Sequence, residues 1–314
     1  MNKNLKYLLI LMSFAACSQN SYDEVYNRAF ELYEEARYEE AIEYYLGAVE
    51  LDPEESKTYN DIGACYLKLQ EYSLALRYFR IALEKRPSNK SSLYNMGKCY
   101  FDIENYEEAS KYLAEAIDYG DSSTRTINLR GIVYSKLNDH QKALNNFNLV
   151  LKIDSNDARG YRNRSTTRNI LGDLNGALLD LEKAIRIEPM NAEGYSYRGR
   201  VYRLNKMYKE ALLDFNMAIS LDSSNYENYF YRGNTYYDSS LYNAAINDYD
   251  FAIKRNPNNA RILYWKGNAY YSSGKLSESI ELYERALRLD SLDVEITDQY
   301  DKAKKKQILS MPQV

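Results

Sequence analysis

Few residues in this sequence could carry out covalent or metal chemistry, and their spacing does not bring them together. His140 is the only histidine, and the three cysteines are Cys17, Cys65 and Cys99. Nucleophilic catalysis needs a hydroxyl or thiol next to a general base, and no such pair can be built around His140. A zinc site would combine one His with two distant Cys, which is a poor ligand set. The sequence therefore predicts no enzyme, no bound metal and no cofactor.

Cys17 follows a segment that differs in composition from the rest of the chain. Lys3 and Lys6 give a short positive region, residues 7–14 form an apolar run, and Ala15 and Ala16 precede the cysteine. This order of positive, apolar and small residues is the layout of a secretory signal. The apolar run is too short to cross a bilayer as a helix. The pattern predicts export, with residues 1–16 removed.

The end of this segment, Ala15-Ala16-Cys17, resembles the cleavage box of bacterial lipoprotein signals, although Phe14 stands where that box usually has Leu. The resemblance implies that Cys17 becomes the first mature residue and carries acyl chains, so that residues 17–21 form a short lipidated tether. Ser18 after the cysteine resembles lipoproteins of the outer membrane of Gram-negative-type bacteria. An ordinary cleaved signal and an uncleaved anchor remain alternatives.

The charge balance argues against binding of nucleic acid. The chain has 41 basic residues against 45 acidic ones, and its net charge is −4. Loss of Lys3 and Lys6 with the signal would make the mature chain more acidic still. A nucleic-acid-binding protein would instead show a surplus of positive charge.

The dominant feature of the sequence is a 34-residue repeat that runs without a gap from Tyr22 to Asp293. The eight repeats are 22–55, 56–89, 90–123, 124–157, 158–191, 192–225, 226–259 and 260–293. The eighth place of each repeat holds a small residue: Ala29, Gly63, Gly97, Gly131, Ser165, Gly199, Gly233 and Gly267. The twenty-fourth place holds a bulky one: Tyr45, Phe79, Leu113, Phe147, Leu181, Phe215, Tyr249 and Tyr283. Periods of this length indicate a repeat architecture.

Each repeat reads as two helices. Places four, eight and eleven share one face of a first helix, and places twenty, twenty-four and twenty-seven share one face of a second. Small residues at places eight and twenty let two backbones approach, and the bulky residue at place twenty-four fills the space beside them. The last place of seven repeats is Asn, Ser or Asp, which are good helix N-caps, and only Glu55 breaks that series.

These residues together resemble the tetratricopeptide repeat. The resemblance implies an all-α fold: a right-handed α-solenoid of eight helix-turn-helix repeats, followed by a capping helix and tail in residues 294–314. Ile296, Tyr300 and Ala303 form the apolar stripe expected of such a cap, which covers the open side of the last repeat. Cys65 and Cys99, both at the tenth place, are expected to be buried and unbridged.

The resemblance also implies a concave groove lined by places two, five, nine and twelve of the first helices, where a ligand binds. The residue types at these places vary along the chain, so they are free to serve a partner. A residue type that recurs every 34 residues is instead expected to serve the scaffold. The arginines at place seven, such as Arg198 and Arg232, are expected to pack on neighbouring tyrosines. The candidate groove residues are Tyr26, Phe30 and Tyr33 in repeat one, Arg159, Arg162, Arg200 and Arg203 in repeats five and six, and Phe230, Tyr237, Tyr264 and Tyr271 in repeats seven and eight.

The four arginines lie between two aromatic patches, and packing of the scaffold does not require them there. They could hold an acidic peptide segment. The sequence thus predicts a lipid-anchored scaffold of the cell envelope that binds another protein. A glycan- or nutrient-binding lipoprotein is the alternative, because aromatic side chains also stack on sugars. Sugar-binding relatives carry long insertions, and no insertion interrupts this register. Some members of the family clamp the C-terminal carboxylate of a partner with Lys or Arg and Asn side chains in the groove. This mode of binding is not expected here, because Thr166 stands where Asn would be needed.

Overall fold

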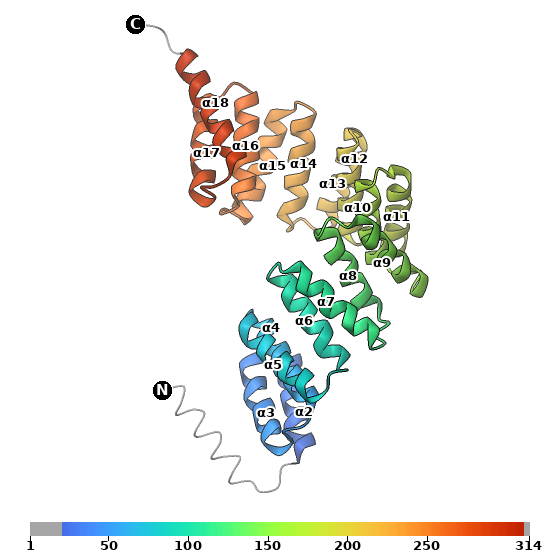
Figure 1. Ribbon diagram of the computed structural model, residues 1–314. Helices are drawn as coiled ribbons and strands as arrows, with labels where there is room; N and C mark the ends of the chain where they lie inside the picture. Colours follow the sequence, from blue (N-terminus) through green and yellow to red (C-terminus); the bar gives the residue numbers. More distant parts are fainter. Residues whose placement is uncertain (1–20, 311–314) are drawn as a thin grey trace. The chain divides into compact units, whose positions relative to one another are not determined.

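The computed structural model describes residues 21–310 of the chain, and all of the regular secondary structure in that range is α-helical (Figure 1). The proposed signal, Cys17 and most of the tether lie outside the described residues, as do residues 311–314. The chain divides into two compact units, one ending at Ser155 and the other beginning at Asn156.

The first unit contains four helix pairs, which correspond to repeats one to four. They are α2 (Tyr22–Glu34) with α3 (Tyr38–Leu51), α4 (Ser56–Lys68) with α5 (Tyr72–Lys85), α6 (Lys90–Asp102) with α7 (Tyr106–Asp118), and α8 (Thr124–Lys136) with α9 (His140–Ile153). The first helix of every pair begins at the first residue of its repeat.

The second unit contains four more pairs and one additional helix. The pairs are α10 (Ala158–Ile170) with α11 (Leu174–Ile187), α12 (Ala192–Leu204) with α13 (Tyr208–Leu221), α14 (Tyr226–Asp238) with α15 (Tyr242–Arg255), and α16 (Ala260–Ser272) with α17 (Leu276–Leu289). The additional helix is α18 (Val294–Ser310). Within each unit every helix packs on its pair partner and on the next pair, which is the arrangement predicted for the repeat fold.

The polar residue before each first helix caps it. The Asn89 side chain accepts a hydrogen bond from the Ser92 backbone amide (3.2 Å), and Asp157 does the same for Gly160 (2.7 Å). Glu55, which breaks the series of short caps, nevertheless accepts from the Lys57 amide (2.9 Å). The longer glutamate side chain therefore also caps its helix, by accepting from a backbone amide that has no partner within the helix.

The turn inside each repeat depends on one residue in the left-handed region. The fifteenth place has a φ of 59° at Ala36, 60° at Glu104 and 84° at Gly172, and the other repeats match. Only three repeats use a residue that tolerates this conformation well: Asn138, Gly172 and Gly274. Packing of the two helices therefore imposes the turn, because the residue types alone do not favour it.

The small eighth place and the bulky twenty-fourth place meet as predicted. A Cβ added to Gly63 would lie 2.6 Å from the Phe79 ring, and one added to Gly267 would lie 2.6 Å from the Tyr283 ring. Phe79 and Tyr283 are both fully buried. Glycine is required here for close approach of the helices, rather than for backbone freedom.

Helix α18 covers the end of the second unit, as predicted for a capping helix. Ile296 and Ala303 are buried and join the apolar cluster of Leu282 and Tyr283 on α17. Tyr300 packs against the same cluster and donates to Glu284 (3.0 Å). None of the helices in residues 21–310 is long and apolar enough to cross a membrane.

Candidate binding surface

The predicted aromatic residues of repeat one do not all lie on an open surface. Tyr26 is buried: its ring stacks on Tyr22, with ring centroids 5.6 Å apart, and its hydroxyl donates to Asp61 on the next first helix. Burial and that carboxylate raise the Tyr26 pKa. Tyr33 is half-buried against Tyr38. Only Phe30, 49% exposed, is open to solvent.

The fifth place packs inward in the second unit as well. Arg162, Phe230 and Tyr264 have exposed fractions of 5–7%, so the prediction that they line an open groove is wrong. The reason is that successive first helices lie side by side. The residue at the fifth place of one helix therefore touches the following helix, as Tyr264 does when it donates to Glu295 on α18 (2.7 Å).

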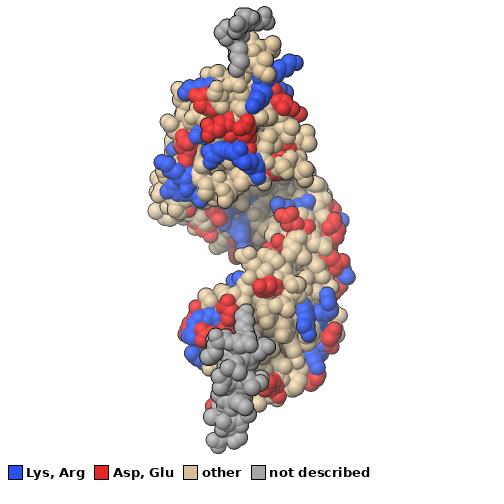
Figure 2. Space-filling model, turned by 90° about the vertical axis from the view of Figure 1, so that its left-hand side faces the viewer, with Lys and Arg blue, Asp and Glu red and all other residues tan. Residues whose placement is uncertain are grey.

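The four predicted arginines do not form a cluster of unneutralised charge. Arg162 forms ion pairs with Glu188 (2.7 Å) and Glu193 (2.8 Å), and Arg203 pairs with Asp238 (2.7 Å). The prediction that all four are available to an acidic partner is therefore wrong for these two residues. On the face drawn in Figure 2, basic and acidic side chains are likewise interspersed.

Arg159 and Arg200 remain from the predicted set. Arg159 is exposed, and no ion pair involves it within residues 21–310. The Arg200 guanidinium lies over the rings of Tyr197 (5.3 Å) and Tyr231 (4.6 Å). These cation–π contacts leave the guanidinium positive while positioning it among aromatic rings.

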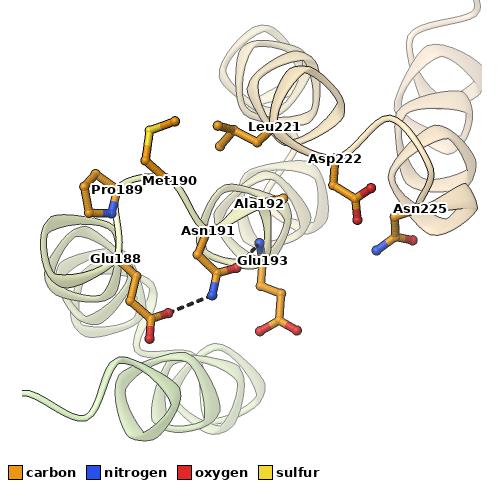
Figure 3. Close-up of a pocket in the computed structure, with 9 residues that line it drawn as sticks. All are labelled: Glu188, Pro189, Met190, Asn191, Ala192, Glu193, Leu221, Asp222 and Asn225. Atoms are coloured by element: carbon orange, nitrogen blue, oxygen red, sulfur yellow. Dashed lines mark hydrogen bonds between the residues drawn. The ribbon is translucent and has the colours of Figure 1, made fainter.

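The ion pairs of Arg162 support one wall of a pocket of about 660 Å³ at the turns before α12 and α14. Its lining residues are Glu188, Pro189, Met190, Asn191, Ala192, Glu193, Leu221, Asp222 and Asn225 (Figure 3). Asn191 donates to Glu188 (2.7 Å) and accepts from the Glu193 amide (2.9 Å). The hydrogen bond from Arg162 lowers the pKa of Glu188. Three carboxylates in the walls make this pocket unsuited to an acidic peptide.

The arginines at place seven have a scaffold role that differs from the expected one. Arg198 does lie near Tyr195 and Tyr202, but its main partner is the buried Asp214, with two contacts of 2.8 Å. Arg232 pairs with Asp248 in the same way. These hydrogen bonds raise the arginine pKa values. The pairs tie the first helix of a repeat to its second helix.

An aromatic surface that sequence reasoning undervalued lies on α12, α14 and α16. We call it the aromatic face, and it consists of Tyr197, Arg200, Tyr231, Tyr237, Trp265 and Tyr271, all half-buried. Tyr237 meets the Trp265 ring edge-on with centroids 5.5 Å apart. The Lys306 ammonium lies 4.6 Å over the Tyr271 ring.

A signal for this surface was present at the sixth place of the repeat. Repeats one to five hold Asn27, Asp61, Asn95, Leu129 and Asn163 there, and repeats six to eight hold Tyr197, Tyr231 and Trp265. The change from non-aromatic to aromatic residues is not periodic, so the scaffold does not require it. The predicted Tyr237 and Tyr271 belong to the same surface, whereas Phe230 and Tyr264 lie beneath it.

The residues considered for covalent chemistry are held apart. Cys65 and Cys99 are buried and unbridged, as predicted, and burial raises their pKa values to about 12 and about 11. Over the described part of the chain, no group of His, Cys, Asp and Glu side chains is arranged to hold a metal ion.

The fold and this surface define a helical-repeat protein. A family model described as tetratricopeptide repeat matches residues 61–124 and 232–294, and a second with that description matches residues 124–157. The chain therefore contains tetratricopeptide repeats and has their solenoid fold. A model described as regulator of microtubule dynamics protein 1-3 matches residues 12–92. No curated protein matches the chain significantly.

Solved structures share the fold at low sequence identity. A tetratricopeptide repeat protein from Parabacteroides merdae is 16% identical, with a TM-score of 0.68 over 80% of this chain and 99% of its own. The APC/C hetero-tetramer Cut9-Hcn1 gives 15% identity and a TM-score of 0.65 over 90% of this chain. This chain spans 55% of that second protein's length. At such identities the likeness concerns the fold alone.

Proposed function

We propose that this protein is a non-catalytic scaffold that binds a segment of another protein on the aromatic face. Tetratricopeptide repeats generally serve protein–protein interaction, which supports the class of function. The observation that carries the site is the aperiodic change at the sixth place, which puts Tyr197, Tyr231 and Trp265 on neighbouring first helices. Tyr, Trp and Arg are the residues that most often dominate binding energy at interfaces.

The chemistry of this face indicates the kind of segment that fits. Tyrosine and tryptophan rings offer apolar area together with polar tips, at a small cost in side-chain entropy. Arg200 adds a positive charge between Tyr197 and Tyr231, and it is the charge on this face best placed for a carboxylate of the partner. The partner segment we propose carries apolar or aromatic side chains next to one acidic group.

Identification of the partner in intact cells tests the proposal directly. A photo-reactive amino acid in place of Arg200 should cross-link a protein at the aromatic face. Once that protein is purified, the double substitution Tyr231→Asn and Trp265→Asn should weaken binding at least about tenfold, because two aromatic anchors are lost. Asparagine occupies the sixth place in repeats one, three and five, so the fold should accept it.

The matched control is Tyr119→Asn, which changes a 51% exposed tyrosine of the first unit and should leave the affinity unchanged. Circular dichroism and thermal unfolding should report a native fold for both proteins. Unaltered affinity in the double variant would remove the aromatic face from consideration. Cross-linking to polysaccharide alone would favour the glycan-binding alternative, since tyrosine and tryptophan rings also stack on sugars.

We further propose that the mature protein is anchored in the cell envelope, in the outer membrane, by acyl chains on Cys17. The layout of residues 1–17 supports this assignment: two lysines, an apolar run, and Ala15-Ala16 before the cysteine. Two acyl chains hold a protein firmly at a membrane, whereas one binds only marginally. A scaffold held in this way would recruit its partner to the membrane surface.

A further inference from the structure

A second concave site lies between α10 and α11, and it uses none of the residues of the aromatic face. The cavity has a volume of about 490 Å³. Its lining residues are Tyr161, Arg164 and Arg168 on α10, and Leu179, Asp180, Glu182, Lys183 and Arg186 on α11. Four side chains carry a positive charge, and two carry a negative one.

In the next two repeats the corresponding charges balance one to one. Arg198 binds both oxygens of Asp214, and Arg232 binds both oxygens of Asp248. Each pair joins one guanidinium to one buried carboxylate. A bidentate pair of this kind satisfies the carboxylate fully and leaves little residual charge.

Repeat five places two guanidiniums on one carboxylate. Arg164 contacts both oxygens of Asp180, at 2.6 Å and 2.8 Å, and Arg168 contacts one of the same oxygens at 2.9 Å. Arg168 also donates to the Gly176 carbonyl (3.1 Å) and forms a second ion pair, with the more exposed Asp173 (3.6 Å). Asp180 is 2% exposed, so the two guanidiniums share it in a partly dry environment, where charges interact more strongly.

The rim of the cavity adds two further cations. Lys183 and Arg186 are exposed on α11, and neither forms an ion pair with any residue between 21 and 310. Leu179, which is 61% exposed, adds an apolar side chain to the α11 wall of the cavity, and Tyr161 lines the α10 wall. Glu182 is the single carboxylate of the lining besides Asp180.

The scaffold does not require Arg168. The eleventh place, occupied by Arg168, is Leu32 in repeat one and tyrosine in the other six repeats. The twenty-sixth and twenty-ninth places hold Lys183 and Arg186 here, but Met217 and Ser220 in repeat six. Repeat eight is also basic at both places, with Arg285 and Arg288, but has Tyr270 at the eleventh. Only repeat five therefore combines Arg168 with a basic residue at both of these places, so that three positive charges meet at one cavity.

We propose that this cavity is a binding site for an oxyanion group, either a phosphate or a carboxylate, and that Arg168, Lys183 and Arg186 are the residues that create it. Arg168 supplies a guanidinium held in place by Asp180 and the Gly176 carbonyl, which suits planar recognition of an oxyanion. Lys183 and Arg186 supply mobile charge at the rim. Tyr161 and Leu179 contact the carbon atoms of the molecule that bears the anion.

The test is calorimetric titration of the full chain with two probes, inorganic pyrophosphate and an acetylated hexaglutamate peptide. At least one probe should bind with a stoichiometry of one, and the affinity should fall as salt is added. Binding of pyrophosphate alone would identify a phosphate site, and binding of the peptide alone a carboxylate site. Absence of binding by both probes at low salt would overturn the proposal.

Two sets of substitutions exchange residues between repeats five and six, at places where the fold already accepts them. Arg168→Tyr, Lys183→Met and Arg186→Ser give repeat five the side chains of repeat six and should weaken binding at least about tenfold, since paired charges are lost. Tyr202→Arg, Met217→Lys and Ser220→Arg should create a second site, because Arg198, Asp214 and Leu213 are already in place there. The stoichiometry would then rise from one to two.

Lys254→Ala, at the twenty-ninth place of repeat seven, controls for the general loss of one surface charge and should not alter binding. Unchanged affinity in the repeat-five variant, with a native circular dichroism spectrum, would overturn the proposal. A repeat-six variant that folds but gains no second site would overturn the claim that these three residues create the site.

Discussion

At the scale of single residues, the long polar side chains decide how this repeat differs from place to place. Arg162 reaches 26 positions along the chain to Glu188, and Arg203 reaches 35 positions to Asp238. In both cases the partner lies on a neighbouring element. A charged side chain that is largely withdrawn from water needs such a partner, because an unpaired buried charge is costly.

Helix α14 offers a direct comparison between a satisfied and an unsatisfied buried amide. Asn228 and Asn234 are each 1% exposed. Asn234 accepts from the Tyr249 hydroxyl (2.8 Å), whereas neither polar side-chain atom of Asn228 has a partner among the described residues. Burial of a polar group without a hydrogen bond costs about 1–3 kcal/mol.

We therefore expect opposite effects from the same substitution at these two positions. Asn228→Val should leave the stability unchanged or raise it by about 1 kcal/mol, because it removes an unsatisfied amide. Asn234→Val should lower it by about 1–3 kcal/mol, because the Tyr249 hydroxyl loses its acceptor. Thermal unfolding of the two variants measures the difference. Equal destabilisation by both would mean that Asn228 is hydrogen-bonded in solution, for example to water.

At the scale of elements, the contact between the two helices of a repeat depends on a missing side chain. Gly233 on α14 faces the Tyr249 ring on α15, and an added Cβ would lie 2.8 Å from that ring. Tyr249 is fully buried. The helix pair therefore has no room for a larger residue at place eight unless place twenty-four becomes smaller.

Gly233→Leu should destabilise repeat seven by about 1–3 kcal/mol or more through overpacking. Because a repeat touches only its neighbours, amide hydrogen exchange should accelerate in α14, α15 and the adjacent helices, while the first unit keeps its protection. Uniform acceleration along the whole chain would contradict this picture.

A second substitution serves as the control for the mechanism. Tyr249→Ala in the Gly233→Leu background should recover part of the lost stability, since the leucine then occupies the volume of the ring. Additive losses in the double variant would mean that the Gly233→Leu cost arises elsewhere.

At the scale of the whole molecule, the chain is an array of repeats whose interactions are local, divided into two units near Ser155. Each unit carries a different chemistry on its first helices: two amides, Asp61 and Leu129 at the sixth place in the first unit, and aromatic rings over most of the second. The proposed partner surface and the proposed oxyanion site both belong to the second unit. The proposed lipid anchor precedes the first.

If Cys17 carries the acyl chains, Cys17→Ala should move the protein from the membrane fraction to the soluble fraction, because no apolar helix in residues 21–310 could replace the anchor. Cell fractionation and mass spectrometry of the N-terminal peptide measure this effect. Cys65→Ala, which alters a buried thiol, should leave the protein in the membrane fraction. A Cys17→Ala protein that remains membrane-bound would contradict the proposed anchor.

Much of the fold follows from the sequence alone. The 34-residue period, the small eighth place and the bulky twenty-fourth place predict eight helix pairs, and each first helix begins where its repeat begins. The cap at Asn89 and the capping helix with Ile296 and Ala303 were predictable for the same reason. These features depend on residues close in sequence, and the repeat pattern that predicts them occurs eight times in the chain.

The binding surface depended on tertiary structure. Sequence spacing assigned Tyr26, Arg162, Phe230 and Tyr264 to an open face, but all four are buried, Tyr26 against the next first helix and Tyr264 against the capping helix. Helical periodicity gives the direction in which a side chain leaves its own helix, and it does not give the distance to the next one. Only the packing of neighbouring repeats determines which side chains are covered, which charges are paired, and which aromatic rings remain available to a partner.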